Sequence, residues 1–287
     1  MVGFYEKPVD DPVKLLDVLG EFTDEWVYRG QPSRFPLQTS LERGLDNAGI
    51  DRKKAPEVER EMIRHFQRMH VQNDRGDVSS DMLYCLSLMQ HHGAPTRVVD
   101  WTYSPFVAAY FALESALDQW SNESGADKNC AVWCLNQKWC STQAKQVAGE
   151  ELIEGRNRDE TRSNKTFCDL YMHQPPFKLV FLENPLRLHM RLHLQQGVFL
   201  CPGDVSVSFE ENLKGMGNWQ EQTAIVKVVC RIEENSQLRD GFGKLRRMNI
   251  LREILFPGLD GFAQSMKYRL PFYEKLAEWR SDKQESA

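Results

Sequence analysis

The stretch from Met89 to Leu113, MQHHGAPTRVVDWTYSPFVAAYFAL, constrains the fold of this chain more than any other part of the sequence. A polar turn around Gly93 leads into the apolar step Val98-Val99, which predicts a short buried strand. Pro105 suits the first turn of a helix, and the alanines that follow it allow that helix to pack closely against a sheet. Because a strand end and a helix start bring backbone N–H groups together, we expect a binding site at this junction.

The polar residues of this stretch leave several interpretations open. His91 and His92 point to opposite sides of an extended segment, so they cannot both bind one metal ion without a bend. Trp101 fits a core position better than a stacking platform. Arg97 and Asp100 can pair across the turn, and we expect both to be largely buried and bonded to each other or to backbone, because an unpaired charge there would cost several kcal/mol.

Composition limits the class of protein. A chain of 287 residues with 41% hydrophobic residues can bury a large core, and we expect a single α+β domain. The net charge of -5 provides no overall basic field for binding duplex nucleic acid. Neither a run of about 18 apolar residues nor a secretory signal is present, so we expect no membrane segment and a cytoplasmic protein.

The seven cysteines are an odd number, scattered through apolar segments, which predicts reduced thiols in the core. Cys130, Cys134 and Cys140 form the only cluster, and they lack the paired spacing of zinc sites. His189 and His193 are four residues apart, but no acidic residue accompanies them in the metalloprotease pattern. We therefore expect no metal.

Hydrophobic periodicity predicts the remaining elements. Helices are expected over residues 11–22, 56–71, 82–90, 105–117, 185–196 and 237–248, and strands over 26–28, 130–135, 178–183, 198–200 and 223–232. The polar segment 136–167 is interpreted as a partly helical, mobile excursion that could face a substrate. The run from Ile250 to Gly261 predicts a strand that breaks at Pro257-Gly258, and a final helix is expected over 262–270.

Arg29 ends the apolar run Trp26-Val27-Tyr28 and precedes Gly30. A guanidinium at a strand end, beside a glycine that permits close backbone approach, is well suited to binding a phosphate through two hydrogen bonds. The alternative for Arg29 is a surface salt bridge. Gln196 lies in a similar position, where polar amides precede the strand that starts at Val198. We expect six residues to line one cleft: Arg29, His92, Arg97, Asp100, Thr102 and Gln196.

Four segments together resemble the FRG domain family, which is named for its Phe-x-Arg-Gly motif. They are Trp26-Val27-Tyr28-Arg29-Gly30, QHHGAPTRVVDWTYSPFVAAYFA, Gln196-Gly197-Val198-Phe199 and Leu255-Phe256-Pro257-Gly258-Leu259-Asp260-Gly261. Val27 stands where the family has Phe. The resemblance spans about residues 25 to 266, and the second segment is long and specific. It implies an N-terminal helical segment over 1–24, an FRG-like domain over 25–270 and a charged tail over 271–287, in a family found in bacteria and phages.

A more distant resemblance is to ADP-ribosyltransferases. These enzymes have a strand-borne Arg-Gly, then a strand with Ser or Thr before an Ala- and Phe-rich helix, then a strand with a catalytic Glu. This chain has Arg29, Thr102 and Glu253 in the same order, although Asp100-Trp101-Thr102 stands where transferases have Ser-Thr-Ser. The resemblance implies a mixed, split β-sheet core flanked by helices.

The same resemblance implies NAD as substrate, with ADP-ribosyl transfer or NAD cleavage as the reaction, as in a toxin or defence effector. NAD cleavage needs a cation for the pyrophosphate and a carboxylate that stabilises an oxocarbenium-like transition state. Arg29, Thr102 and Glu253 are the implied catalytic residues, and Asp260 or Asp100 could replace Glu253. The implied cofactor-binding residues are Arg29, Gly30, His92, Arg97, Asp100, Trp101, Thr102, Tyr103 and Gln196.

Two other functions are compatible with the same residues. One is a non-catalytic module that senses a nucleotide or a nucleic-acid end in the same pocket. The other is a metal-independent hydrolase with His91 or His92 as base and Asp100 as its orienting group, although no nucleophile lies at a glycine elbow. A protein or a nucleic acid could accept the ADP-ribosyl group. Release of nicotinamide from NAD distinguishes the transferase from the binding module.

Overall fold

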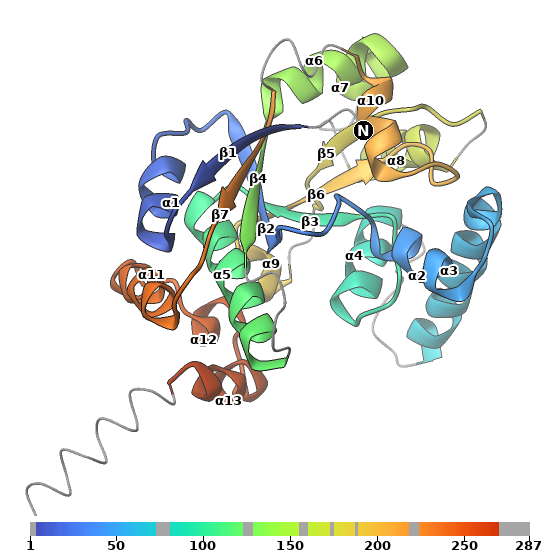
Figure 1. The fold of residues 1–287 in the computed structure, drawn as a ribbon. Coiled ribbons are helices and arrows are strands. Elements are labelled where there is room, and N and C mark those ends of the chain that lie inside the picture. Colours follow the sequence, from blue (N-terminus) through green and yellow to red (C-terminus); the bar gives the residue numbers. More distant parts are fainter. Residues whose placement is uncertain are drawn as a thin grey trace, which may run out of the picture.

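The computed structural model describes residues 4–72, 81–122, 129–154, 160–172, 175–186, 189–217 and 224–269. It is an α+β fold with one seven-stranded mixed sheet flanked by helices, as the sequence predicts (Figure 1). Along the sheet the order is β1 (Tyr5–Val9), β7 (Ile225–Cys230), β4 (Cys130–Asn136), β2 (Trp26–Pro32), β3 (Val99–Thr102), β6 (Gly197–Pro202) and β5 (Val180–Glu183). Only β1 and β7 pair in parallel within this sheet.

The sheet opens between β2 and β3. These two strands share the single pair Tyr28 and Thr102, whereas β2 and β4 are in register from Trp26 to Pro32. Beyond Tyr28 the two strands no longer pair, so backbone groups and side chains from both half-sheets meet at the opening. The strand that carries the Arg-Gly segment and the strand that carries the Asp-Trp-Thr segment are therefore neighbours.

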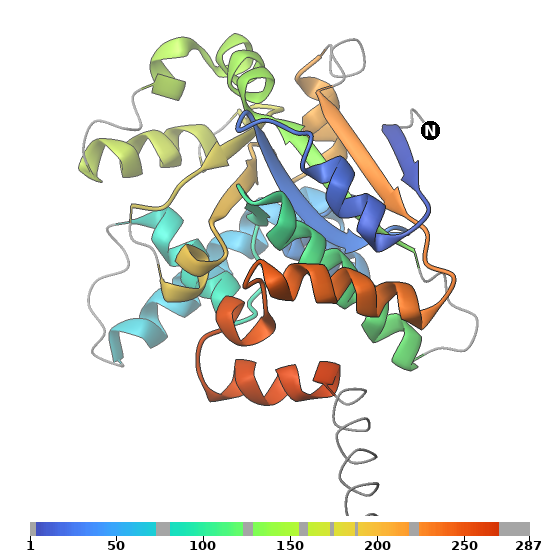
Figure 2. The same ribbon diagram turned by 90° about the vertical axis from the view of Figure 1, so that its left-hand side faces the viewer.

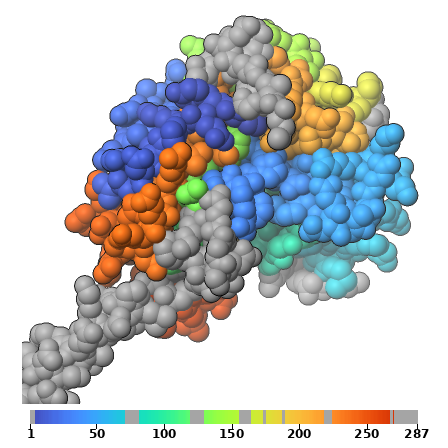
Figure 3. All heavy atoms as spheres, viewed as in Figure 1, coloured from blue at the N-terminus to red at the C-terminus, as the bar shows by residue number. Residues whose placement is uncertain are grey.

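Helices cover the two faces of the sheet. Figure 2 shows α1 (Pro12–Leu19), α5 (Pro105–Asn122) and α11 (Asn235–Arg247) on one face, where the three helices contact one another. The other helices are α2 (Ser40–Ala48), α3 (Ala55–Gln72), α4 (Met82–His91), α6 (Gln137–Ala148), α7 (Glu150–Glu154), α8 (Glu160–Tyr171), α9 (Met190–Leu194), α10 (Phe209–Gly215), α12 (Arg252–Leu255) and α13 (Leu259–Ser265). In the space-filling view the blue N-terminal region adjoins the orange residues of α11 (Figure 3).

Close packing of α5 on β2 explains the glycine of the Arg-Gly segment. A Cβ atom at Gly30 would lie 1.9 Å from the Ala108 carbonyl oxygen and 2.5 Å from the Ala112 nitrogen. Ala108, Ala109 and Ala112 are fully buried, so small residues on both sides bring the two backbones together. This confirms that the alanines allow a close helix–sheet approach, and it shows that Gly30 makes room for α5.

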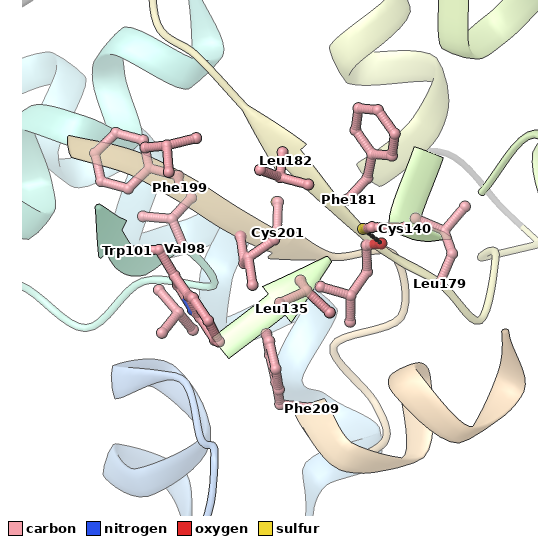
Figure 4. Packing of buried hydrophobic residues seen from close by; sticks show 14 of the residues in the cluster. Val98, Trp101, Leu135, Cys140, Leu179, Phe181, Leu182, Phe199, Cys201 and Phe209 are labelled. Atoms are coloured by element: carbon pink, nitrogen blue, oxygen red, sulfur yellow. Dashed lines mark hydrogen bonds between the residues drawn. The ribbon is translucent and has the colours of Figure 1, made fainter. Parts of the chain in front are cut away.

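The larger core cluster lies around β3, β5 and β6. Figure 4 shows Trp101 among Val98, Leu135 and Phe209 in this cluster. Trp101 is 3% exposed, which confirms the core interpretation of this residue. All the described cysteines except Cys168 are buried, and all seven are free thiols, as the sequence predicts.

The predicted elements are mostly present, and three predictions are wrong. Residues 252–255 form the short helix α12 and not a strand, because the apolar residues Ile250, Leu251, Ile254 and Leu255 recur at a spacing of four, with Arg252 and Glu253 between them, which suits a helix. Much of the segment 136–167 forms α6, α7 and α8, with Trp139 and Cys140 buried in the core, so it is not a polar excursion. The N-terminal segment, which was expected to be helical, contains the strand β1 as well as the helix α1.

Candidate functional site

The Arg29 side chain occupies the opening between β2 and β3. Its Nη1 donates to the main-chain oxygen of Asp100 at 2.6 Å, and its Nε donates to Gln31 Oε1 at 3.1 Å. In a regular ladder the Asp100 carbonyl would accept from a backbone N–H of β2, so the guanidinium takes the place of a strand hydrogen bond. Within the described residues no carboxylate forms an ion pair with Arg29.

Arg29 and Thr102 extend from opposite faces of the sheet. Thr102 is the register partner of Tyr28, and successive side chains along a strand alternate between faces. The expectation that Arg29 and Thr102 line one cleft with the other four residues is therefore wrong. Arg29 contacts the site through the main chain of Asp100.

Asp100 is the exposed residue of an otherwise buried strand. Gln90, in the last turn of α4, donates from Nε2 to Asp100 Oδ2 at 2.9 Å. No other described side chain donates to the Asp100 carboxylate, which leaves Oδ1 open. The prediction that Asp100 is largely buried and bonded to Arg97 or to backbone is wrong, because Asp100 is exposed and its carboxylate accepts from Gln90, whereas the predicted burial of Arg97 is confirmed.

A second arginine, Arg191 of α9, is coupled to the Asp100 charge. Arg191 is half-buried and lies over the Phe256 ring, 4.4 Å from its centroid. Burial lowers the pKa of Arg191, and the charge of Asp100 opposes that shift. Burial likewise lowers the pKa of Arg29, again against the attraction of Asp100. In the described part of the chain, neither arginine has an ion pair, so one carboxylate faces two partly desolvated cations.

Three histidines lie close together beside this site, and the charge of Asp100 acts on one of them, His189. The His91 and His189 rings lie 4.6 Å apart between centroids, and His92 lies 5.0 Å from His91. Burial lowers the pKa of His189, and His91 adds to this shift. His189 is not helical. Its Nδ1 accepts from the Leu192 N–H and caps α9. His189 and His193 therefore do not lie on one face of a common helix.

The start of β6 completes the neighbourhood. Thr102 is 4% exposed. Its Oγ1 donates to the Gln195 carbonyl at 2.7 Å and accepts from the Ser104 N–H, so both bonds of this hydroxyl are made within the protein. Gln196 is exposed and has a φ of 48°, which is unusual for a residue other than glycine. Its carbonyl accepts from the Tyr103 N–H. Tyr103 is 37% exposed and exchanges hydrogen bonds with Asn184.

Arg97 lies away from this site. Its Nε donates to Glu59 Oε1 at 2.8 Å, its Nη2 pairs with Glu59 Oε2, and its Nη1 donates to the Tyr171 carbonyl at 2.6 Å. Both side chains of the ion pair are at most 3% exposed. Arg97 therefore joins α3 and α8 to the loop before β3, and the predicted ligand-binding role is wrong because no surface of the guanidinium is open.

Glu253 also lies in a different setting from the one predicted. It is in the first turn of α12 and forms an ion pair with Arg269. The neighbour of β3 on the side away from β2 is β6, so no carboxylate from residues 250–261 stands on a strand beside Thr102. Among the carboxylates considered from the sequence, Asp100 is the one that the structure places beside Arg29 and Arg191.

Sequence reasoning missed Gln90 and Arg191. Gln90 could have been found, because it directly precedes the two histidines that drew attention to the segment. Arg191 carries no local signal, since the sequence does not reveal that α9 packs beside β6 and Phe256. Among the described residues no group of three His, Cys, Asp or Glu side chains could hold a metal ion.

None of the helices in the described part of the chain has the length and apolar character needed to cross a membrane.

Comparison with known proteins gives one match. Neither a curated protein nor a solved structure matches the chain. Residues 24–120, which contain β2, α2, α3, α4, β3 and most of α5, match the family model of the FRG domain. The resemblance of this chain to the FRG domain family is thereby confirmed over that segment.

Proposed function

We propose that this chain binds NAD at the site around Asp100 and breaks the bond between nicotinamide and ribose. The ADP-ribosyl group then passes to water or to an acceptor. The observation that carries this proposal is the exposed Asp100 carboxylate, held by Gln90 and coupled to two half-buried arginines that form no ion pair with any described residue. Glu114, the other carboxylate that acts on Arg191, is paired with Arg252. One carboxylate is therefore left for two cations, so the site has an excess of positive charge that an anionic ligand would balance.

Arg191 is the residue proposed to bind the pyrophosphate. Its guanidinium is partly desolvated and is oriented by the Phe256 ring, which limits its freedom before a ligand binds. Arginine forms two parallel hydrogen bonds to phosphate, and bonds of this charged type are stronger than neutral ones. Arg29 acts differently. It holds the Asp100 main chain in place and adds to the positive potential.

Asp100 is proposed to stabilise the transition state. As the C1′–N bond breaks, its electron pair leaves with nicotinamide, and positive charge develops on the ribose ring. A fixed carboxylate near that ring, or bonded to a ribose hydroxyl, stabilises this charge. The oxygen of water or of an acceptor hydroxyl then bonds to C1′ and releases its proton.

The opening of the sheet supports the same proposal. ADP-ribosyltransferases are expected to have a split sheet, and β2 and β3 share a single residue pair. The strand order Arg-Gly, then Asp-Trp-Thr, also agrees with that expectation. Asp100 takes the role that the sequence suggested for Glu253.

The alternative is a nucleotide-binding module without catalytic activity. The ion pair between Glu253 and Arg269 favours it, because the residue aligned with the transferase glutamate is then neutralised. In that case the positive site still binds a nucleotide, but NAD stays intact.

Isothermal titration with NAD and quantification of free nicotinamide test the proposal. Arg191→Gln should weaken NAD binding by about 1.5–3 kcal/mol, the usual value of a charged hydrogen bond. Arg246→Gln is a matched control, since Arg246 is an exposed arginine of α11. Binding of NAD without release of nicotinamide by the wild-type protein would favour the module. If the wild-type protein neither binds NAD nor releases nicotinamide, NAD binding and NAD cleavage at this site are both rejected.

A further inference from the structure

We infer that Gln90 is a positioning residue that fixes the Asp100 carboxylate, and that Ser40 and Thr96 hold Gln90 in the required orientation. The effect of this Gln90–Asp100 contact on catalysis rests on the function proposed above. The hydrogen bonds themselves join the start of α2 to the end of α4 and the loop before β3, which lie 50 and 56 residues further along the chain.

The two ends of the Gln90 amide have different partners. Oε1 accepts from Thr96 Oγ1 at 2.6 Å and from Ser40 Oγ at 3.2 Å, while Nε2 donates to Asp100 Oδ2 at 2.9 Å. The Ser40 hydroxyl also accepts from the Thr96 N–H at 2.9 Å and lies 3.2 Å from the Thr96 carbonyl oxygen. The oxygen end of the amide is therefore anchored on two hydroxyl groups.

This arrangement determines which group faces Asp100. If the amide were turned over, Oε1 would meet Asp100 Oδ2, and two acceptors cannot form a hydrogen bond unless the carboxyl group is protonated. The observed orientation gives the ionised carboxylate a donor and lets the Thr96 hydroxyl donate to Oε1, while the single Ser40 proton is shared between Oε1 and the Thr96 carbonyl oxygen. Gln90 thus occupies Oδ2, and no described side chain donates to Oδ1.

Burial agrees with this role. Thr96 is fully buried and Gln90 is half-buried, whereas Asp100 is exposed. The network therefore runs from the protein interior to a carboxylate at the surface. A side chain fixed in this way keeps its geometry without the rotational freedom of an ordinary surface aspartate.

A double-mutant cycle on nicotinamide release tests the inference, with Gln90→Leu, Asp100→Asn and both together. Gln90→Leu should lower the release rate about 10- to 100-fold, the scale of a small displacement of a reacting group, with NAD affinity changed by less than about 3-fold. In the Asp100→Asn background, Gln90→Leu should have almost no further effect, because Gln90 acts through Asp100.

Gln38→Leu is the matched control. Gln38 Nε2 donates to Asp46 Oδ2 at the same 2.9 Å, in an exposed pair outside the site, so this variant should release nicotinamide at the wild-type rate. An equal loss from Gln90→Leu in both backgrounds would overturn the positioning role, since a structural defect does not depend on the residue at position 100. An unchanged rate in Gln90→Leu would overturn it as well.

Urea unfolding of the same four proteins separates failure of this inference from failure of the proposed function. If the wild-type protein releases no nicotinamide, the proposed function is rejected, and the contact is judged by stability alone. A coupling of about 3- to 10-fold in the unfolding equilibrium constant, typical of the net contribution of one hydrogen bond, supports the Gln90–Asp100 contact. Additive effects of the two substitutions reject it.

Discussion

Loss of one member of the Arg97–Glu59 ion pair should destabilise the protein more than loss of both. The pair is almost completely buried, and burial opposes the charge on Arg97, but the attraction of Glu59 outweighs it and raises the arginine pKa. Glu59→Leu leaves a buried guanidinium without its counter-charge. We expect a cost of about 3–5 kcal/mol, because a lone buried charge loses its hydration without compensation.

The double variant Glu59→Leu with Arg97→Met removes both charges and fills the space with apolar atoms. Replacement of a buried ion pair in this way is often close to neutral. The lost hydrogen bond to the Tyr171 carbonyl adds a cost of about 1–3 kcal/mol. The double variant should therefore be more stable than Glu59→Leu alone.

Urea unfolding and thermal melting followed by circular dichroism measure this order. A cost of 3–5 kcal/mol corresponds to a fall in Tm of roughly 6–20 °C for a domain of about this size. Glu61→Gln is the control, since Glu61 forms an exposed pair with Arg64 on the same helix and should contribute less than about 1 kcal/mol. If the stability losses of Glu59→Leu alone and Arg97→Met alone add up in the double variant, Arg97 and Glu59 do not depend on each other, and the reasoning is refuted.

Three further predictions concern other parts of the molecule. Glu253→Gln should lower stability by less than about 1 kcal/mol in urea unfolding, because its pair with Arg269 is only partly buried; a loss of several kcal/mol would contradict this. Gly30→Ala should cost more than about 3 kcal/mol or prevent soluble expression, since its Cβ would overlap the backbone of α5, and wild-type stability would show that the helix can move. Burial lowers the pKa of His91 and of His189 below 6.5, so the unfolded chain takes up protons first, and the urea midpoint should fall as the pH drops below about 6.5. His91→Gln should reduce that pH dependence, and an unchanged slope would exclude His91 as a source.

Most of the fold could be predicted from periodicity. Apolar runs such as the six residues Cys130 to Leu135 of β4 and amphipathic helices such as α3 bury their own faces, so local sequence determines them. The prediction for the segment after Ile250 failed because Ile250, Leu251, Ile254 and Leu255 were interpreted as part of a strand, although their spacing of four residues suits a helix. Strand β1 was missed because its burial is low and its place at the edge of the sheet depends on pairing with β7.

The site could be predicted only in part. Arg29 and Asp100 were selected as polar residues at predicted strand ends. The structure places both within strands, β2 and β3, and brings the Arg29 side chain into contact with Asp100. Their relation could not be predicted, because the guanidinium contacts the main chain of Asp100 across an opening in the sheet. Arg97 was misassigned because its partner, Glu59, lies 38 residues away and is joined to it only by the packing of α3.

The rate of nicotinamide release by the wild-type protein, Asp100→Asn and Glu253→Gln tests the central claim most directly. All three proteins should bind NAD with similar affinity, as measured by isothermal titration. Asp100→Asn should release nicotinamide about 10²- to 10³-fold more slowly, the usual effect of removing one preorganised electrostatic group, while Glu253→Gln keeps the wild-type rate. Slow release by Glu253→Gln together with a wild-type rate in Asp100→Asn would contradict the assignment of Asp100 as the catalytic carboxylate.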